Sequence, residues 1–586
     1  MTRIKWTGRF EGYHSSAFSK DLVSGLIVGV IAIPLGMAFA IASGVKPEYG
    51  IYTTIVAGIL ISLFGGSKFQ IGGPTGAFIP ILFAIVMQYG YENLLIAGFL
   101  AGIILVVMGV LNFGKLIKFI PRPVTIGFTA GIAVIIFSGQ IASFLGLKDI
   151  EKHENFLPNM REIITHLSTL NIYSLLTAGV GLIVMIAAPK LLPKVPSSLV
   201  GLIISSVVAA LFFNGSVATI GSTYGAIPSA LPHFHFPEIT WAQIETLIRP
   251  AIIIALLGGI ESLLSAVVAD GMTGSRHNSN RELIGQGIAN MVTPLFGGIP
   301  VTGAIARTAT NIKSGAMSPM SGVIHGIVVF FVLILLAPYA SRIPLASMAP
   351  ILMLVAWNMS ERKKFIQILR TRTADSIVLL ITFSLTVFTN LTTAVEVGLV
   401  LAIILFVKQM SEMLTVTKVL PDPTINHEKV KAYMVTAEHD CPQISILSID
   451  GSLFFGTASM FEKSVMDAIR LHSKIVLLRM GKMPFMDTTG ESHLTALLKH
   501  SEKSGGIILI SGIQSQPLEL LRKTGLIDRI GNDHRFEHTG DAIDYALTQL
   551  NTNKCLGCKH FAFRECTALS NADPSDVPTQ IEVQMN

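Results

Sequence analysis

Residues 251–270 read AIIIALLGGIESLLSAVVAD, an apolar stretch that carries one carboxylate, Glu261, near its middle. An ionisable side chain at that depth in an apolar span is a candidate functional group, because burying a charge in lipid is costly. The stretch is soon followed by GGIPVTGA (Gly297–Ala304), which echoes the earlier IGGPTGAF (Ile71–Phe78). Paired Gly-rich breaks in apolar segments, one in each half of a chain, indicate the binding site of a transporter.

The composition of the chain is that of a membrane protein with many spans. Of its 586 residues, 51% are hydrophobic and only 14% are charged, which is too apolar for an ordinary soluble protein. Uncharged runs of about 20 residues, long enough to cross a bilayer as a helix, begin with Leu22–Val45 and recur to about residue 409. The basic, polar start of the chain leads into the first span without a cleavage pattern, so we expect no removable signal peptide.

The distribution of lysine and arginine predicts the topology. These residues gather in short loops, for example around Lys115 and Lys190, which lie on one face when the spans are counted. The long loops on the opposite face carry fewer of them, so we expect both termini in the cytoplasm of a bacterium and the spans in its inner membrane. The net charge of +6 is spread over these loops without a basic cluster, and we therefore expect no nucleic-acid partner.

We expect the chain to have five parts. They are a cytoplasmic leader (1–20), a membrane domain (21–410), a polar linker (411–430), a small α/β domain (431–550) and a flexible, Cys-containing tail (551–586) whose last part is disordered. The membrane domain contains two sets of about seven hydrophobic segments. An odd number of segments in each set, with matching breaks at the third position, requires the two sets to have opposite orientations and so predicts an inverted repeat.

The two breaks are the predicted anion site. A helix that begins partway across the bilayer directs unpaired N–H groups and the positive end of its dipole at whatever lies in front of it. If the two breaks face each other, two such helices converge on one ligand. The alternative is that their small residues only permit tight helix packing. The candidate substrate-binding residues are Thr75, Gly76 and Ala77 in the first break, and Thr302, Gly303, Ala304 and the nearby Arg307 in the second.

Two charged residues require a separate interpretation. Arg307, about one turn beyond Thr302, would add a positive charge near the anion, unless it is a loop-end arginine that reaches the membrane surface. Glu261 would repel an anion unless it is protonated or paired with a cation, which indicates a role in ion coupling. It could take up a proton together with the substrate, since desolvation favours the neutral form, or it could bind Na⁺ alongside Ser265. An ion pair with Arg307 or a basic loop residue is the third alternative.

These residues occur in segments that resemble one known family, the SulP anion transporters with a C-terminal STAS domain. The resemblance covers nearly the whole chain and is carried by DLVSGLIVGVIAIPLGMAFAIASGV (Asp21–Val45), GGPTGAF (Gly72–Phe78), ESLLSAVVADGMTG (Glu261–Gly274) and SNRELIGQGIAN (Ser279–Asn290). It implies an all-α membrane fold of fourteen segments in two inverted seven-segment repeats, divided into a core and a gate. The anion would lie between the third and tenth segments, and the family commonly forms homodimers.

The resemblance also bears on the site and the substrate. Thr75–Ala77 and Thr302–Ala304 match the starts of the family's third and tenth segments, and Glu261 and Ser265 match the acid and hydroxyl of its eighth. In sodium-coupled bicarbonate members that acid is typically an aspartate. The stretches IAIPLGMAFAIASGV, ADGMTG, IARTATN and LMLVAWNMSE look most like the branch that imports C4-dicarboxylates such as succinate and fumarate.

We therefore expect a secondary active anion importer, coupled to protons and specific for C4-dicarboxylates. Sodium-coupled bicarbonate transport and the transport of sulfate or another inorganic anion are alternatives. An anion channel, or an anion sensor that signals through the STAS domain, represents a different class of function. The chain contains no G-x-x-x-x-G-K-[ST] pattern for ATP-driven pumping, and we expect neither enzymatic activity nor a cofactor.

The predicted cytoplasmic domain carries one motif of its own. MPFMDTTGES (Met483–Ser492) resembles the STAS signature, in which the hydroxyl after the aspartate is phosphorylated in anti-sigma-factor antagonists. The matching residue is Thr488, whose phosphorylation could alter docking of a cytoplasmic partner. The simpler interpretation is that Asp487 and Thr488 cap a helix that begins near Gly490.

The four cysteines of the chain are Cys441, Cys555, Cys558 and Cys566. We expect no structural disulfide, since all four fall in the predicted cytoplasmic part. Three of them, together with His560, are suitable ligand types for Zn²⁺, but their spacing is unusual. The sequence favours ordinary reduced cysteines in a flexible tail, and hence no metal.

Overall fold

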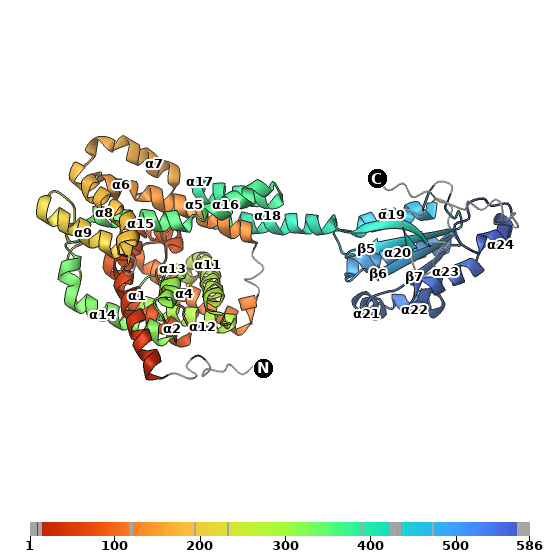
Figure 1. Ribbon diagram of the computed structural model, residues 1–586, viewed down its shortest axis with the longest axis horizontal. Coiled ribbons are helices and arrows are strands. Elements are labelled where there is room, and N and C mark those ends of the chain that lie inside the picture. Colours follow the sequence, from red (N-terminus) through yellow and green to blue (C-terminus); the bar gives the residue numbers. More distant parts are fainter. Residues whose placement is uncertain are drawn as a thin grey trace. The chain divides into compact units, whose positions relative to one another are not determined.

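The computed structural model describes residues 9, 14–115, 121–153, 155–192, 195–230, 234–389, 391–421, 430–431, 435–436, 439–470 and 474–570. The chain forms two compact units, Met1–Ala402 and Ile403–Asn586. The first unit is predominantly helical, whereas the second is built around a six-stranded sheet (Figure 1).

The elements up to α18, which crosses from the first unit into the second, fall into two series, each with a short strand between its second α-helix and the α-helices that follow. The first series consists of α1 (Ser15–Ala42), α2 (Pro47–Phe64), β1 (Gly72–Gly73), η1 (Gly76–Phe78), α3 (Ile79–Tyr89), α4 (Tyr91–Val110), α5 (Arg122–Gly139), α6 (Ile141–Leu145), α7 (Phe156–Thr165), η3 (Leu167–Thr169), α8 (Ile172–Leu191), α9 (Ser197–Phe212) and α10 (Ile220–Tyr224). The second consists of α11 (Trp241–Thr273), α12 (Ser279–Val292), η4 (Thr293–Phe296), β2 (Thr302–Gly303), α13 (Ile305–Lys313), α14 (Met320–Ala340), α15 (Leu345–Met359), α16 (Arg362–Thr371), α17 (Ala374–Phe388) and α18 (Leu391–Ser411).

Seven helices in the described part of the chain are long and apolar enough to cross a membrane. Shorter apolar helices, among them Gly76–Tyr89 and Ser197–Phe212, contribute further segments. The longest is α11, which carries Glu261. It begins with a capping box at Thr240, whose hydroxyl accepts a hydrogen bond from the Gln243 N–H, and it ends where Gly274 adopts a left-handed conformation.

The packing of the helices shows the inverted repeat. In the first series α1 packs against α14 of the second, and in the reciprocal pair α11 packs against α4. The same exchange relates the pairs α2 with α14 and α12 with α4. A two-fold relation between the series produces such reciprocal pairs, so the sequence prediction of an inverted repeat agrees with the structure.

The helices also separate into two groups. One group contains α1 to α4 with α11 to α14, and the other contains α5, α6, α8 and α9 with α15 to α17. Figure 1 shows α2, α4, α12 and α14 in the lower part of the unit, and α5 to α9 with α15 to α17 above them. The two groups correspond to the predicted core and gate.

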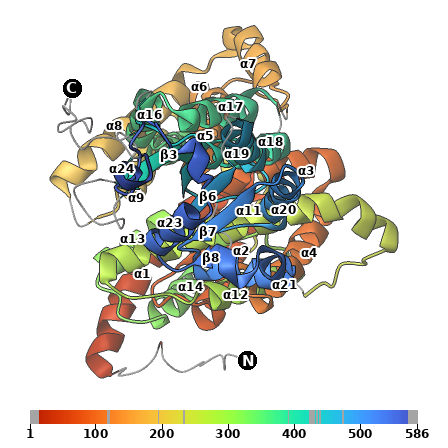
Figure 2. The same ribbon diagram turned by 90° about the vertical axis from the view of Figure 1, so that its right-hand side faces the viewer.

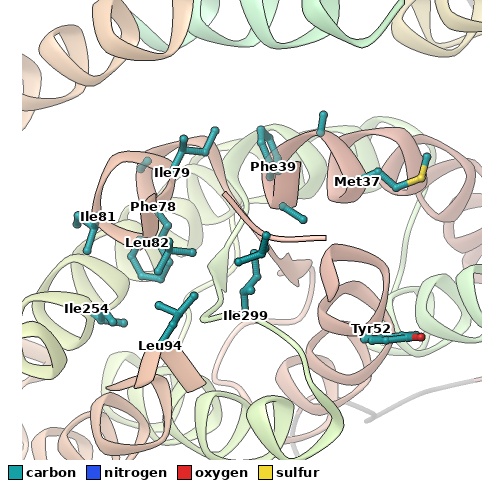
Figure 3. Packing of buried hydrophobic residues seen from close by; sticks show 14 of the residues in the cluster. Met37, Phe39, Tyr52, Phe78, Ile79, Ile81, Leu82, Leu94, Ile254 and Ile299 are labelled. Carbon is teal, nitrogen blue, oxygen red and sulfur yellow. The ribbon is translucent and has the colours of Figure 1, made fainter. Parts of the chain in front are cut away.

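Close packing in the first group depends on small residues. Gly36 of α1 and Gly50 of α2 face each other so closely that a Cβ atom on Gly50 would overlap the Gly36 carbonyl. Larger apolar side chains fill the remaining space: Phe78, Leu82, Ile254 and Leu94 lie together where α3, α4 and α11 meet (Figure 3). This packing fixes the start of α3 against the helix that carries Glu261.

The sheet of the second unit has the strand order β4-β3-β5-β6-β7-β8. The strands are β3 (Thr415–Pro421), β4 (Val430–Lys431), β5 (Ile444–Asp450), β6 (Ile475–Lys482), β7 (Ile507–Ser511) and β8 (Arg535–Phe536). Strands β5 to β8 are parallel, and β3 is antiparallel to both of its neighbours. The helical elements are α19 (Ala458–Arg470), α20 (Thr488–Lys503), α21 (Ser515–Lys523), α22 (Leu526–Ile530), η6 (Asn532–His534), α23 (Thr539–Thr548), η7 (Thr552–Lys554) and α24 (Cys566–Ser570).

Both faces of the sheet are covered. Along β6, Val476 and Leu478 join the core beneath α19 and α20, whereas Ile475 and Leu477 join the core beneath α23. This alternation follows the two-residue period of a strand. Figure 2 shows α19 and α20 on one side of the strands and α23 on the other.

The structure corrects several predicted boundaries. Helix α1 begins at Ser15, inside the predicted leader, and the predicted linker 411–430 contains strand β3. The alternation in TVTKVLP is short and is followed by prolines, which masks the strand in the sequence. Helix α20 begins at Thr488 rather than near Gly490. The predicted tail is folded over residues 551–570, and the predicted disorder of its last part falls outside the described residues.

Candidate functional site

The two breaks that the sequence predicts to face each other are hydrogen-bonded neighbours. Strand β1 pairs antiparallel with β2, with Gly72 opposite Gly303 and Gly73 opposite Thr302. The pairing continues where the Ala304 N–H donates to the Ile71 carbonyl over 2.8 Å. Each strand then leads into a helix, η1 with α3 on one side and α13 on the other. Two helix starts therefore meet in the interior of the unit.

Glu261 lies between these two starts. The Thr75 hydroxyl donates to Glu261 Oε2 over 3.0 Å, and the Thr302 hydroxyl approaches the same oxygen at 3.4 Å. Thr302 also donates to the Gly303 carbonyl at 2.9 Å. One carboxylate oxygen thus contacts a hydroxyl from each break. The structure brings together the three side chains that the sequence analysis named as binding and coupling groups.

The backbone of the second break is held by side chains that the sequence analysis did not identify. The Gly303 N–H donates to the Ser262 hydroxyl over 2.9 Å, and the Asn290 amide accepts from the Val301 N–H and donates to the Val301 carbonyl. The Thr53 hydroxyl accepts from the Ile299 N–H at 2.8 Å. Irregular backbone inside a membrane must find such partners, since lipid supplies none.

Two N–H groups of the predicted site have partners of this kind. The N–H groups of Gly303 and Ala304 donate to the Ser262 hydroxyl and the Ile71 carbonyl, and the role of the two residues in binding the substrate stays a prediction. Helix α13 begins one residue later, at Ile305, and its unpaired N–H groups belong to its own first turn. On the opposite side, Gly76 and Ala77 form the first turn of η1, as expected of donors at a helix start. A Cβ atom on Gly76 would lie 3.1 Å from Met359 Sδ, so only a minimal side chain fits there.

Arg307 is buried and does not reach the membrane surface. Its side chain is 3% exposed, and Nη2 donates to the Pro74 carbonyl, immediately before Thr75. A Cβ atom on Gly73 would collide with the guanidinium group, so the glycine is required for this approach. Arg307 therefore ties α13 to the first break. Arg307 donates to a backbone carbonyl, whereas Glu261 accepts from two threonine hydroxyls. These separate partners are evidence against the ion pair between Arg307 and Glu261 that the sequence allows.

Ser265 does not join Glu261 in the structure. It is buried and donates to the Thr308 hydroxyl over 3.2 Å, while Thr308 accepts from the Ile71 N–H. This chain of contacts braces α11 against α13 and β1. The role of Ser265 as a sodium ligand stays a prediction.

A cavity of about 870 Å³ leads towards the start of α3. It lies between the two helix groups, with Ala38 and Ile79 on one side and Ile136 and Leu352 on the other. Its outer part is lined by the loops around residues 146–153 and 214–224, which contribute Lys148, Lys152 and His153 among others. Basic side chains at the mouth of a cavity raise the local concentration of anions.

In the second unit, the predicted regulatory pair lies at the start of α20. Asp487 is the N-cap: Oδ1 accepts from the Gly490 N–H at 2.8 Å and Oδ2 accepts from the Phe455 N–H at 3.0 Å. Thr488 is the first residue of the helix and is exposed. Capping is therefore a structural role of Asp487, and phosphorylation of Thr488 stays a prediction.

Replacing Asp487 by alanine should weaken this corner of the domain. The loss of an N-cap side chain costs about 1 kcal/mol, so hydrogen exchange at the Gly490 and Phe455 amides of the full chain should become about fivefold faster. Asp467→Ala, at an exposed position within α19, serves as the control. Equal exchange in both variants would show that the cap contributes nothing.

The four cysteines are free, and all of them line one small cavity in the second unit together with His560. Three were predicted to lie in a flexible tail. The fourth, Cys441, lies in the segment just before β5. It is far from the other three cysteines in the sequence, so the sequence alone did not show that it lies beside them.

Models of two families match the chain. The Sulfate permease family matches residues 18–382, and the STAS domain matches residues 434–542. Among similar proteins is the putative sulfate transporter YvdB of Bacillus subtilis, which is 56% identical over 91% of this chain and 99% of that protein. The bicarbonate transporter BicA of a Picosynechococcus strain is 28% identical over 90% of this chain and 94% of that protein.

Solved structures share the fold. The overall structure of SLC26A9 matches 93% of this chain and 92% of its own with a TM-score of 0.82, at 18% sequence identity. The transmembrane domain of a cyanobacterium bicarbonate transporter BicA matches 67% of this chain and 98% of its own, with a TM-score of 0.58 and 29% identity.

Proposed function

Because this chain belongs to the sulfate permease family, the members of which are multi-pass anion transporters, we propose that it imports a small dianion together with protons. The observation that carries the proposal is the pair of threonine hydroxyls, one from each break, that both contact Glu261 Oε2. The substrate class and the coupling ion are the parts of the proposal that require experiment.

In the proposed mechanism Glu261 acts as a tethered competitor of the substrate. Its carboxylate accepts the hydroxyl hydrogen of Thr75 and competes with the Gly303 carbonyl for that of Thr302, and a bound anion would use both donors. Protonation removes the negative charge and weakens both hydrogen bonds, since a charged acceptor binds a donor more strongly than a neutral one. The two hydroxyls and the two helix starts are then available to the anion. Substrate and proton thus occupy the site together.

The site needs no covalent chemistry to perform transport. The anion would reach it through the cavity that passes Lys148 and Lys152 and ends beside the start of α3. A movement of the core helices against the gate helices would then open the site to the other side of the membrane. Binding at two helix starts suits a dianion, because each start carries a partial positive charge.

We propose C4-dicarboxylates such as succinate and fumarate as the substrates, on the resemblance of the first span and of the segments near Glu261 to that branch. Sulfate is the second candidate, because a relative 56% identical to this chain is named as a putative sulfate transporter. Transport of bicarbonate driven by Na⁺ is the third candidate. It is less well supported, because the hydroxyl of Ser265 is engaged by Thr308 rather than directed at Glu261.

The same proposal includes the setting of the protein. The distribution of lysine and arginine supports insertion in the inner membrane with both termini in the cytoplasm. The family resemblance supports a homodimer, and the exposed Thr488 is available to a cytoplasmic partner of the STAS domain.

Uptake into proteoliposomes tests the proposal. Labelled succinate, fumarate, sulfate and bicarbonate would each be offered under an imposed proton gradient and, separately, under a sodium gradient. We expect accumulation of succinate above its equilibrium level with protons alone. Dissipation of a substrate gradient without accumulation would indicate a channel, and binding without any flux would indicate a sensor. Accumulation driven only by Na⁺ would contradict the proposed coupling.

Thr302→Val should weaken anion binding by about 1 kcal/mol, or about fivefold in Kd, through the loss of one hydrogen bond. The measurement is substrate affinity in detergent. Thr302→Ser keeps the hydroxyl and should bind nearly as the wild type does. An unchanged affinity in the valine variant would show that the anion binds elsewhere.

A further inference from the structure

All four cysteines of the chain come together in the second unit, although Cys441 is far from the other three in the sequence. Cys441 lies three residues before β5, and Cys555, Cys558 and Cys566 follow the last sheet helix, α23. The STAS match ends at residue 542, so the last three cysteines belong to an extension beyond it. The convergence of all four cysteines of a 586-residue chain on one place calls for a physical explanation.

The extension is anchored on the sheet domain and is not a loose tail. Ala562 and Phe563 are buried in the same hydrophobic cluster as Cys441 and the strand residue Ile444. The Gln443 side chain binds it from the other side: its amide donates to the Asn551 carbonyl at 3.2 Å and to Cys555 Sγ at 3.3 Å, and it accepts from the Asn551 N–H at 3.1 Å. These contacts hold the extension where its thiols face Cys441.

The four thiols line a single small cavity. Its volume is about 20 Å³, which is room for one water-sized particle. His560 also lines it, and His560 Nδ1 is a buried nitrogen without a hydrogen-bond partner in the described part of the chain. Nearby, His439 Nδ1 donates to the His560 carbonyl over 3.2 Å. The cavity lining thus combines four thiols and one imidazole with apolar side chains and Lys554, and thiolates are soft ligands that select Zn²⁺.

The raised pKa values of the thiols agree with their burial around one cavity. Burial raises the pKa of Cys566 to about 11, and the neighbouring Cys441, Cys558 and Cys555 add to the effect by mutual repulsion of their thiolates. Burial likewise raises the pKa of Cys441 and of Cys555. Burial thus favours the neutral form of Cys441, Cys555 and Cys566. A cation at the centre would reverse this preference, since metal ligation deprotonates a thiol outright.

We propose that Cys441, Cys555, Cys558 and Cys566 bind one Zn²⁺ as four thiolates. Tetrahedral sulfur coordination is typical of a structural zinc site, and the C-x2-C spacing of Cys555 and Cys558 fits one half of it. The size of the cavity fits a single ion rather than an iron–sulfur cluster. Zinc binding releases the thiol protons to solvent, so affinity should rise with pH.

In the ligand-free arrangement, no three His, Cys, Asp or Glu side chains of the described residues stand at metal-ligand separation. The thiols line the walls of the cavity and would have to close on its centre, where each sulfur would lie about 2.3 Å from the metal. Gly557, between Cys555 and Cys558, is left-handed at φ 72° and has open space where a Cβ would lie, so no neighbouring atom obstructs the turn there. Zinc would thus lock the extension onto the sheet domain.

The proposal is tested on the full chain, purified under reducing conditions through a tag without histidines. We expect about one zinc per chain by mass spectrometry, and a loss of at least about tenfold in Cys558→Ser and in Cys441→Ser. His500→Ala, at an exposed position on α20, is the control and should retain the metal. Zinc that remains in both cysteine variants would overturn the assignment.

A second measurement uses the unmodified chain and so does not depend on the folding of a variant. Co²⁺ replaces Zn²⁺ in thiolate sites and gives intense absorption bands that report sulfur ligation and tetrahedral geometry. We expect these bands to saturate at one equivalent and to disappear on addition of zinc. A wild-type chain that lacks zinc and shows no cobalt–thiolate bands would refute the site, and iron with sulfide in place of zinc would refute the identity of the metal. The result is independent of the transported anion.

Discussion

We expect Glu261→Gln to abolish uphill accumulation of substrate in proteoliposomes under a proton gradient, while the anion still binds. Glutamine has nearly the shape of glutamate and can still meet Thr75 and Thr302, but it cannot carry a proton across the membrane. Coupling energies between two ligands are commonly about 1–3 kcal/mol, which corresponds to a change in affinity of about 5–150-fold. We expect this effect of protons on anion affinity to be lost in Glu261→Gln.

The proposed mechanism also predicts the direction in which anion affinity changes with pH. In the wild type, a lower pH protonates Glu261 and releases the two hydroxyls, so anion affinity should rise as pH falls. In Glu261→Gln the side chain is neutral at every pH and its weaker contact with the hydroxyls does not change, so affinity should be flat across the same range. Binding measured at several pH values, beside uptake with and without the gradient, distinguishes coupling from a simple loss of fold.

Glu396→Gln is the matched control, because Glu396 is exposed on α18 and makes only a loose ion pair of 3.9 Å with Arg249. It should accumulate substrate as the wild type does. Unchanged accumulation in Glu261→Gln would rule out the tethered-competitor mechanism and leave the proton to another group.

Arg307→Met should reduce anion uptake by about tenfold or more. The side chain is almost fully buried and donates to the Pro74 carbonyl, so it fixes the backbone that presents Thr75 and adds a positive charge behind the site. A hydrogen bond from a charged group contributes about 1.5–3 kcal/mol, and methionine keeps the volume but loses both the bond and the charge. Initial rates of uptake, with gel filtration to check the fold, provide the measurement.

Two variants define the contribution of Arg307. Arg307→Lys keeps the charge without the planar guanidinium fork, so a partial recovery would assign part of the effect to charge alone. Arg249→Met changes an exposed arginine of α11 and should behave as the wild type. Full uptake in Arg307→Met would show that the break keeps its shape without this tie.

The centre of the site could be predicted from the sequence because its evidence is local. A duplicated Thr-Gly-Ala break and a carboxylate in the middle of an apolar span are visible along the chain, and the structure brings Thr75, Thr302 and Glu261 together. The apolar runs likewise predicted helical spans in the membrane domain, and the pattern of the later region predicted an α/β domain, since each depends on burial of apolar faces.

The remaining features depend on partners far apart in the sequence. Ser262 and Asn290 look like ordinary small or polar residues of a span, and only the fold shows that they satisfy the backbone of the second break. For the same reason the sequence could not show that the N–H groups of Gly303 and Ala304 have side-chain and backbone partners. Ser265 was paired with Glu261 by helical spacing, whereas its hydrogen bond goes to Thr308 on another element. A polar atom in lipid had to find a partner, but spacing alone could not identify it.

The pairing of β1 with β2 sets an order for the biosynthesis of the protein. Gly72 and Gly73 leave the ribosome some 230 residues before Gly303 and Thr302, a delay of about 10–45 s at usual rates of translation. Through that interval the first break has no strand partner, and its backbone needs water, lipid headgroups or the insertion machinery to satisfy it. The first seven segments thus cannot complete their own site during insertion. We expect a truncated chain that stops before residue 297 to be retained by quality control, even though each of its helices is apolar enough to insert.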